Sequence, residues 1–427
     1  MVDLRPLQGP SRAPITAGYL ARLLDAFAAT PLPGESFVAI LEVLRPDPSV
    51  ELEARGLPVA SRRRVPPSGR LFRSAALTLD SFLLRGAEVG TSFRADREGA
   101  RGTVYHTAGG ALPLASGLPV VATLLDLAPW ELPERYARSP AARFGHRLRA
   151  RILRDATRLI VPSRATAESA RRRLHIPAER ISVVPLAPGE AFRFAVASAA
   201  DGSAAVGPAF DARTVVDGLR QRLDLPKRFF VYAGRYDARK DMATLFDALA
   251  GLKAESPASA LGGAWPPVLA MAGTRAISGG ELESDSSALG RAVERRGLGD
   301  VVRLTPPLEP AELAALIAGA RGFVYPALSD STGLPVAEAL AVGAPVIASK
   351  AGCLPELVGA AGIIVEPRQA GRLAAALRTL WSDDALHHQL RAVAAERAAR
   401  NRRTWTDVAR ETRAVYSVAL ADAASRG

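Results

Sequence analysis

The sequence is poor in cysteine and has no long hydrophobic run that suits a membrane-spanning helix. Cys353 is the one cysteine among 427 residues, which excludes a disulfide framework and favours a reducing compartment. The uncharged stretch 102–125 contains two prolines and four glycines, so we expect loops and a short strand there. Residues 1–12 carry charges and no apolar core, so we expect no secretory signal. The sequence predicts a cytoplasmic protein that is soluble or peripheral on the inner face of the membrane.

Metal-binding and nucleic-acid-binding patterns are also missing from the sequence. The five histidines do not lie at metal-ligand spacing, and there is no Asp-x-Asp pair that would bridge a metal to a diphosphate. Neither zinc-finger spacing nor the aromatic signature of an RNA-binding domain occurs. We therefore expect no metal or other cofactor and no nucleic-acid partner.

Apolar runs of strand length alternate with helical patterns along most of the chain. In the second half, a helix-like segment follows each of "RFFVYAG", "PPVLAMAG", "DVVRLT", "GFVYPA", "PVIAS" and "AGIIVE". Nearly continuous apolar strands joined by helices are typical of a parallel sheet covered on both faces. A weaker form of the pattern runs through the first half. Because the chain is long for one core, we predict an α/β protein with two doubly wound, Rossmann-like domains.

Composition suggests where the two domains meet. The segment 194–212 consists of small residues without periodicity, as expected of a linker or insertion. We therefore expect an N-terminal Rossmann-like domain over residues 1–193 and a linker or insertion over 194–225. A second Rossmann-like domain is expected over 226–404.

The positive charge of the chain is unevenly distributed. The formal net charge is +12, and the segment from Arg135 to Arg180 holds thirteen arginines against three acids. Five of these arginines recur at helical spacing and would share one helix face: Arg143, Arg147, Arg151, Arg154 and Arg158. Such a face suits an anionic membrane surface or a polyanionic acceptor. It is equally typical of the solvated face of a core helix.

Three cations cluster where a strand meets a helix in "YAGRYDARKDMATL" (232–245). Asp241 is a natural N-cap for the helix, and Arg235, Arg239 and Lys240 come just before it. The positive end of a helix disfavours cations, so this grouping indicates an anion, most commonly a phosphate. The alternative is a solvated basic loop whose arginines pair with neighbouring aspartates.

The segment "SDSTGLPVAEALAVGAPVIAS" (329–349) holds two acids around a Gly-Leu-Pro turn. We expect Gly333 to open a helix with backbone N–H groups able to hold a phosphate. Glu338, expected in the first helical turn, could accept adjacent ribose hydroxyls, and Asp330 could hold a sugar hydroxyl. The alternative is that Glu338 complements the helix dipole and Asp330 caps a turn. The presence of both loops in one domain favours the ligand-binding interpretation.

These segments resemble the retaining glycosyltransferases of family 4, which have the GT-B fold, with two Rossmann-like domains facing a central cleft. The resemblance rests on "AGRYDARKDMATL", "YPALSDSTGLPVAEALAVGAPVIAS", "LPELVGAAGIIVEP" and the late "RTWTDVA". It covers about residues 226–410. The family pattern has seven residues between two acids, which are Asp330 and Glu338 here.

The resemblance assigns roles to individual residues of the second domain. It implies that Arg235 and Lys240 bind the diphosphate of a nucleotide-sugar donor. It also implies that Glu338 holds the ribose and that Asp330, an aspartate where the family has glutamate, holds the donor sugar. The backbone of Gly333 and Leu334 would hold the sugar or a phosphate.

The first domain resembles the family's polysaccharide mannosyltransferase-like members more loosely. The glycine-rich loop that usually precedes the first helix has Ile15 and Ala17, beside Pro14, where the family has glycine. A backbone that must approach a phosphate closely favours glycine. The family's His-Asp pair after a central strand is Leu125-Asp126 here, so the histidine that contacts the donor sugar is absent. Asp126 is a candidate for organising the acceptor side.

The function predicted from the resemblance is a retaining transfer of a hexose, such as mannose, from a nucleotide-sugar to a glycan or lipid-linked acceptor in cell-surface polysaccharide synthesis. The second domain would hold the donor, the first the acceptor, and residues 405–427 would form a helix returning to the first domain. Holding both substrates together provides catalysis by proximity, and Arg235, Lys240 and backbone N–H groups would stabilise the leaving diphosphate.

Two other functions remain open on the sequence alone. One is a catalytically silent relative that binds a nucleotide or glycan as a scaffold or partner subunit, which the missing histidine and loop glycines favour. The other is a polyanion-binding protein built on the basic helix, whose binding would weaken steeply with salt. That function leaves the loop containing Asp330 and Glu338 unexplained.

Overall fold

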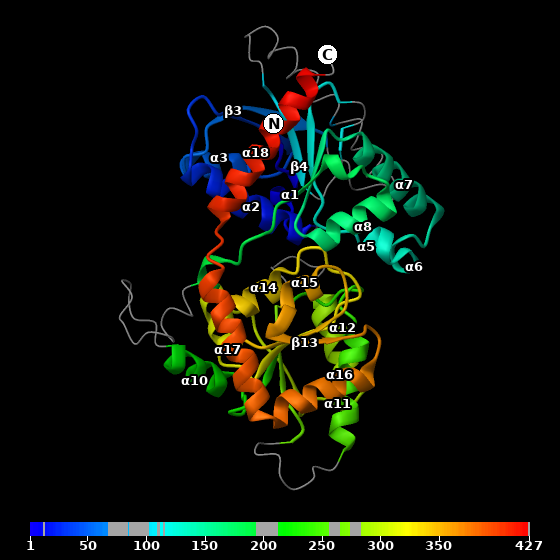
Figure 1. Cartoon of the computed structure of the whole chain (residues 1–427), viewed down its shortest axis with the longest axis vertical. Coiled ribbons are helices and arrows are strands. Elements are labelled where there is room, and N and C mark those ends of the chain that lie inside the picture. Colours follow the sequence, from blue (N-terminus) through cyan, green and yellow to red (C-terminus); the bar gives the residue numbers. More distant parts are fainter. Residues whose placement is uncertain are drawn as a thin grey trace. The chain divides into compact units, whose positions relative to one another are not determined.

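A computed structural model describes residues 1–11, 13–66, 84, 102–108, 112–113, 116–193, 212–255, 265–273 and 283–425. The chain divides into two compact units (Figure 1). Unit 1 comprises Met1–Leu186 together with Thr404–Gly427, and unit 2 comprises Ala187–Arg403. Each unit is built on its own parallel sheet.

The sheet of unit 1 contains seven described strands in the order β3-β2-β1-β4-β5-β6-β7, and all its described pairings are parallel. The strands are β1 (Val2–Asp3), β2 (Phe37–Glu42), β3 (Val59–Val65), β4 (Tyr105–Ala108), β5 (Val120–Thr123), β6 (Arg158–Val161) and β7 (Ile181–Val183). Its helices are α1 (Arg5–Gln8), α2 (Pro14–Ala29), α3 (Pro48–Ala54), α5 (Ala128–Glu131), α6 (Pro133–Tyr136), α7 (Pro140–Asp155), α8 (Arg164–Leu174), η1 (Ala178–Arg180) and α18 (Trp405–Ala424).

The sheet of unit 2 has six described strands in the order β10-β9-β8-β11-β12-β13, again with parallel pairings. The strands are β8 (Phe230–Ala233), β9 (Leu269–Ala272), β10 (Val302–Leu304), β11 (Gly322–Tyr325), β12 (Val346–Ser349) and β13 (Gly362–Val365). Its helices are α10 (Ala212–Arg222), α11 (Met242–Ala254), α12 (Glu283–Glu294), α13 (Pro310–Ala318), α14 (Leu334–Ala341), α15 (Leu354–Val358), η2 (Gly359–Ala361), α16 (Ala370–Ser382) and α17 (Asp384–Arg400).

The central strands are buried along their whole length because helices cover both faces of a doubly wound sheet. Every residue of β8, β9, β11 and β12 is buried, and so is every residue of β4 and β5. The edge strand β3 alternates between half-buried and exposed residues instead, which suits its arginine-rich sequence "VASRRRV". The two α/β sheets expected from the sequence are thus present.

The division between the units differs in detail from the boundaries expected from composition. Unit 2 begins at Ala187, upstream of residue 194, and helix α10 lies inside the segment expected to be a linker. Part of that segment, residues 194–211, lies outside the described residues. Helix α10 packs against α13, which explains why it belongs to unit 2.

The last helix, α18, belongs to unit 1 although it follows unit 2 in the chain. A capping box starts it: the Thr404 hydroxyl accepts from the Asp407 N–H at 3.2 Å, and the Asp407 carboxylate accepts from the Thr404 N–H at 2.9 Å. Figure 1 shows α18, in red, lying along α2, and the two helices are in contact. The pair Arg158–Asp422, at 2.7 Å, also ties α18 to strand β6.

Among the described residues, no helix combines the length and the apolar character needed to cross a membrane. The stretch 102–125 instead contributes strands β4 and β5, as far as its residues are described.

Candidate functional site

The loops that follow β8 and β11 meet where the strand order of the unit 2 sheet reverses. The two strands are parallel neighbours, yet the chain continues from β8 to β9 on one side and from β11 to β12 on the other. Ligands of open α/β sheets bind at this point, beyond the carboxyl ends of the strands. The N–H of Leu328 donates to the carbonyl of Arg239 at 2.6 Å and so joins the two loops.

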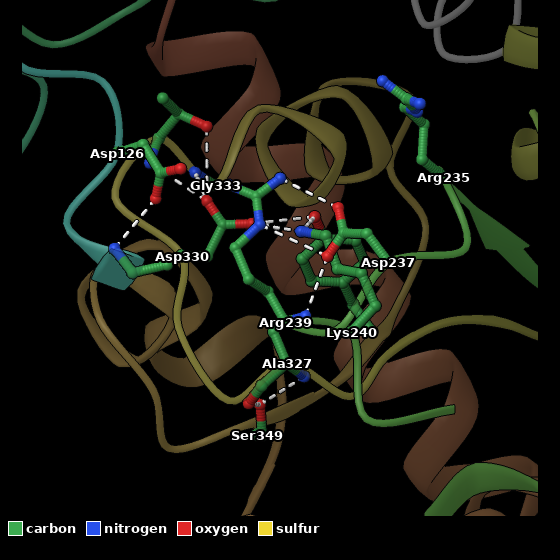
Figure 2. Close-up of polar contacts among 12 residues, drawn as sticks. Asp126, Arg235, Asp237, Arg239, Lys240, Ala327, Asp330, Gly333 and Ser349 are labelled. Atoms are coloured by element: carbon green, nitrogen blue, oxygen red, sulfur yellow. Dashed lines mark hydrogen bonds and ion pairs between the residues drawn. The ribbon is translucent and has the colours of Figure 1, made fainter. Parts of the chain in front are cut away.

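Lys240 and Asp330, one from each loop, form a buried ion pair (Figure 2). The Lys240 Nζ lies 2.6 Å from Oδ2 of Asp330, and the side chains are 8% and 7% exposed. Nζ also donates to the Tyr325 hydroxyl and lies 4.3 Å from the centre of that ring. The Tyr325 hydroxyl in turn donates to Oδ2 of Asp330 at 2.8 Å. A buried ion pair is stable only when further hydrogen bonds satisfy its polar atoms, and this tyrosine provides them.

The second oxygen of Asp330 organises the start of helix α14. Oδ1 accepts from the Gly333 N–H at 2.7 Å, from the Thr332 N–H at 3.0 Å and from the Thr332 hydroxyl at 3.2 Å. Burial alone would raise the pKa of the Asp330 carboxyl. The Lys240 ammonium and the hydrogen bonds from Lys240, Gly333 and Tyr325 outweigh it and hold that pKa well below its usual range. Asp330 is therefore an ionised, fully hydrogen-bonded anchor of the loop.

Two glycines allow the loop to take this shape. Gly333 has a left-handed φ of 57°, and a Cβ there would lie 2.1 Å from Cδ1 of Leu357 and 2.8 Å from Sγ of Cys353. At Gly352, with φ of 50°, a Cβ would lie 1.9 Å from the Asp330 carbonyl oxygen. The Cys353 side chain is fully buried, and burial raises the pKa of its thiol, in keeping with a packing role.

The basic residues of the first loop separate into different environments. Arg239 pairs with Asp237 at 2.9 Å. This is the arginine–aspartate pairing that the alternative interpretation of the loop predicted. Asp237 is partly buried, yet the Arg239 hydrogen bond and the nearby positive charges lower the pKa of its carboxyl. Figure 2 shows Arg235 standing apart, with its side chain directed away from Lys240 and Arg239. Of the two residues of this loop that were predicted to bind a diphosphate, Lys240 is therefore the one that pairs with the Asp330 carboxylate.

Three local expectations from the sequence are wrong. Asp241 occupies the N-cap position of α11 but does not cap it, because its backbone is left-handed and its carboxylate accepts from the Arg368 N–H at 3.1 Å. Glu338 lies in the second turn of α14 because the helix begins only at Leu334. The N–H of Gly333 is not open to a phosphate, since Asp330 already accepts from it.

Two backbone N–H groups in the first turn of α14 have no hydrogen-bond partner in the described part of the chain. Leu334 and Val336 have N–H groups that donate to nothing in the described part of the chain, and Pro335 has none to offer. Both lie in the first turn, where the helix dipole favours an anion. Val336 is fully buried and Leu334 is half-buried, so the Leu334 N–H is the better placed of the two for a ligand. Glu338 is half-buried one turn later. Among the sequence-predicted residues, Leu334 and Lys240 are thus the groups best arranged to receive a phosphate.

The basic helix α7 exposes four of the predicted arginines. Its N-cap is Ser139, whose hydroxyl accepts from Ala142 at 3.1 Å. The exposed arginines, which have no acidic partner among the described residues, are Arg143, Arg147, Arg151 and Arg154. Phe144, between the first two, is 60% exposed. We name these five residues the basic face of α7.

Arg158 does not belong to that face, contrary to the sequence prediction. Helix α7 ends at Asp155, and Arg158 opens strand β6, where it pairs with Asp422. The opposite side of α7 is anchored by Arg149, whose guanidinium lies 5.3 Å from the ring centre of Trp130. Burial lowers the pKa of Arg149, and the charge of Asp126 opposes that shift.

Two family models match most of the chain. Residues 219–398 match the model described as "Glycosyl transferases group 1", and residues 42–187 match "Glycosyltransferase Family 4". The chain belongs to glycosyltransferase family 4. The resemblance inferred from the motifs is thereby confirmed.

Curated relatives are about one third identical to the chain over the aligned segments. A D-inositol 3-phosphate glycosyltransferase of Nocardioides sp. is 34% identical over 48% of this chain and 44% of its own length. An MMP alpha-(1->4)-mannosyltransferase of Mycolicibacterium hassiacum is 36% identical over 32% of this chain and 33% of its own length. The chain spans about half the length, or less, of these relatives.

Solved structures show that the chain has the GT-B fold. Sucrose-phosphate synthase from Thermosynechococcus elongatus superimposes with a TM-score of 0.65, at 20% identity, over 95% of this chain and 93% of that one. HepE from Anabaena in complex with UDP gives a TM-score of 0.63, at 18% identity, over 98% of both chains. The expected GT-B fold is confirmed.

The departures from the family-4 pattern in unit 1 have a structural explanation. Pro14 is the first residue of α2, so Ile15 and Ala17 lie within a helix rather than in a glycine-rich loop. Ile15 is 36% exposed, and Ala17 is buried. Leu125, at the position of the family histidine, is 2% exposed. Asp126 follows it and accepts from the Ala128 N–H at 2.9 Å, which starts helix α5.

Sequence reasoning missed Tyr325 and Thr332, which complete the hydrogen bonding of Asp330. Tyr325 appears in the sequence as one more apolar residue of the strand "GFVYPA", so nothing distinguishes it from core. A signal existed for Thr332: an aspartate followed two residues later by threonine commonly forms a local side-chain-to-backbone turn.

Proposed function

We propose that the protein is a retaining hexosyltransferase that transfers a sugar from a nucleotide-sugar donor to a glycan or lipid-linked acceptor. The observation that carries this proposal is the juxtaposition of Lys240 with the first turn of α14 at the strand-order reversal of unit 2. A cationic side chain and the Leu334 N–H on adjacent segments suit a diphosphate. Family membership supports the same activity.

Each group has a role in the proposed reaction. Lys240 and the N–H group of Leu334 stabilise the negative charge that grows on the leaving diphosphate. Glu338 accepts hydroxyls of the donor ribose, and Arg235 approaches the diphosphate from the edge of the loop. Asp126 organises the acceptor in unit 1. No enzyme nucleophile is required, because holding donor and acceptor together contributes much of the rate. The proposed reaction is independent of metal, so EDTA should leave transfer unchanged.

The donor is proposed to be a nucleotide-linked hexose. HepE has been solved with UDP and with UDP-glucose, and relatives of this chain include an O-antigen chain mannosyltransferase from Escherichia coli. These names support glucose-like or mannose-like donors and cell-surface polysaccharide as the product. They leave UDP and GDP as the two nucleotides to compare first.

The basic face of α7 is proposed to rest on an anionic membrane surface. Four exposed arginines would contact lipid phosphates, and Phe144 would enter the boundary between head groups and acyl chains. Such a surface would hold the protein at the inner face of the membrane, beside a lipid-linked acceptor.

The decisive experiment measures binding and transfer together. The thermal midpoint of the purified protein is recorded with UDP-glucose, UDP-galactose, GDP-mannose and dTDP-glucose, for the wild type and for Glu338→Ala. A ligand at about 100 times its dissociation constant adds roughly 2.7 kcal/mol, a shift of a few degrees. We expect one nucleotide to give this shift, Glu338→Ala to lose it, and sugar transfer to follow with a membrane extract as acceptor.

A catalytically silent scaffold is the second candidate, and Leu125 in place of the family histidine favours it. That candidate predicts a thermal shift with one nucleotide but no transfer to any acceptor. If neither a shift nor transfer occurs with any donor, the proposed hexosyltransferase activity is wrong.

A further inference from the structure

We infer that Asp330 and Tyr325 are positioning residues for Lys240, and that the Asp330 carboxylate does not contact the donor sugar. This inference rests on the proposed function, because it concerns how the diphosphate ligand Lys240 is held. It assigns Asp330 a role different from the sugar contact that the family resemblance implies.

The first argument is the hydrogen-bonding capacity of the carboxylate. A carboxylate has about four acceptor positions. Asp330 accepts from five donors of the protein itself: Lys240 Nζ and the Tyr325 hydroxyl on Oδ2, and the N–H groups of Thr332 and Gly333 and the Thr332 hydroxyl on Oδ1. Every acceptor position is occupied, so a sugar hydroxyl would have to displace one of these bonds.

The second argument is the unused donor of Lys240. An ammonium group has three N–H donors. Two of them are used in the described structure, toward Asp330 and the Tyr325 hydroxyl. The third donates to no described group, and the long, flexible side chain is held so that only 8% of it is exposed. The remaining N–H of this immobilised ammonium is well suited to a phosphate oxygen. Little side-chain conformational entropy would be lost on binding, because folding has already fixed the lysine side chain.

The third argument is the length of the side chain at position 330. An aspartate bonds readily to backbone N–H groups two and three residues ahead, as Asp330 does with Thr332 and Gly333. A glutamate places its carboxylate one methylene further from the backbone. The shorter side chain therefore draws the carboxylate back onto its own loop and onto Lys240. Tyr325 completes the arrangement from the buried strand β11, where its ring stacks on Tyr232 with centres 6.1 Å apart.

The test compares nucleotides with and without the sugar. Dissociation constants of UDP and UDP-glucose, and of GDP and GDP-mannose, are measured by calorimetry for the wild type, Asp330→Asn, Tyr325→Phe and Lys240→Ala. We expect Asp330→Asn to weaken binding of the diphosphate and of the sugar-diphosphate of the recognised base equally, by roughly tenfold, because the ion pair that holds Lys240 is lost. Tyr325→Phe, which leaves the loop bonds of Asp330 intact, should weaken both equally by a smaller factor.

Double variants separate positioning from a general loosening of the loop. Asp330→Asn should have no further effect on binding once Lys240 is alanine, because it acts through Lys240. Ser349→Ala is the matched control: its hydroxyl accepts from the Ala327 N–H at 2.8 Å in the same loop without touching Lys240. Its effect should add to that of Lys240→Ala.

Two results would overturn the inference. If Asp330→Asn weakens UDP-glucose or GDP-mannose and leaves UDP or GDP unchanged, the carboxylate contacts the sugar. If Tyr325→Phe and Asp330→Asn both add fully to Lys240→Ala, neither residue acts through the lysine. A wild type that binds none of the four nucleotides would instead overturn the proposed function, and the inference with it.

Discussion

Arg413 forms an ion pair with Glu35, which lies 378 positions earlier in the sequence. Its Nε lies 2.9 Å from Oε1 and its Nη2 lies 2.6 Å from Oε2. The two side chains are 12% and 18% exposed, and the guanidinium also lies 4.5 Å from the ring centre of Phe27. A bidentate ion pair of this kind requires the planar guanidinium group of arginine. It connects helix α18 to the loop between α2 and β2.

Replacing Arg413 by alanine should destabilise the folded protein by about 2–3 kcal/mol, because the partly buried Glu35 loses its partner. The change should appear as a lower thermal midpoint and as faster amide exchange along α18. Arg413→Lys should recover only part of the loss. The control is Arg400→Ala, whose pair with Glu396 is 79% and 60% exposed and contributes less than about 1 kcal/mol. Equal effects of the two alanine variants would contradict the structural role of Arg413.

Gly333→Ala should disturb the loop of the candidate site. Its Cβ would meet Leu357 and Cys353, and its left-handed backbone disfavours a side chain. We expect a loss of about 1–3 kcal/mol in stability and a smaller thermal shift with the recognised nucleotide. Gly371→Ala, in helix α16 with nothing within 4 Å of the added Cβ, serves as the control and should be neutral or slightly stabilising. A Gly333→Ala protein that matches the control in stability and binding would show that the described loop conformation is not required.

The buried histidine of unit 1 predicts an acid sensitivity. Nε2 of His106 lies 2.9 Å from the Thr123 hydroxyl and Nδ1 lies 2.6 Å from the Tyr416 hydroxyl. Burial lowers the pKa of His106 from 6.5 to about 3, so the fold favours the neutral ring. Between those values the unfolded chain binds a proton that the folded chain does not, so stability falls as the pH drops from about 6.5 toward 3.

Denaturant titrations from pH 7 to pH 4 check this expectation. The wild type should lose on the order of 3 kcal/mol from this residue over that interval, and His106→Gln should show a flatter pH dependence. If His106→Gln retains the full acid sensitivity of the wild type, other groups carry it.

The basic face of α7 should bind anionic vesicles. The wild type should sediment with vesicles of phosphatidylglycerol and phosphatidylcholine at low salt and be released as salt rises. Changing Arg143, Arg147, Arg151 and Arg154 to glutamine should abolish most of the binding, at roughly 1 kcal/mol for each arginine near the surface. Phe144→Ala should weaken it further.

A second variant with the same net charge as the α7 variant provides the control for the vesicle experiment. It replaces four exposed arginines of unit 2 by glutamine, namely Arg291, Arg295, Arg372 and Arg400. If this variant loses as much vesicle binding as the α7 variant, net charge rather than the basic face is responsible. Wild-type protein that fails to bind the vesicles even at low salt would remove the membrane proposal altogether.

Much of the architecture was readable in the sequence because it depends on local pattern. Buried parallel strands need continuous apolar runs, so "RFFVYAG" and "GFVYPA" predicted β8 and β11 directly. The order of strand and helix then predicted a doubly wound sheet, and the two acids around Gly333 predicted which loops carry the site. Spacing within one loop survives folding unchanged, which is why the family motif was visible without a structure.

Only the tertiary structure decided which side chains meet. Lys240 and Asp330 are 90 residues apart, and their contact depends on the reversal of strand order between β8 and β11. Tyr325 joins them from a strand whose pattern specifies only that it is buried. The exclusion of Arg158 from the basic face likewise follows from where α7 ends, which depends on packing as well as on helical spacing. Local sequence thus determined the elements and the loops, whereas pairing between distant segments, which needs the whole fold, determined the chemistry of each side chain.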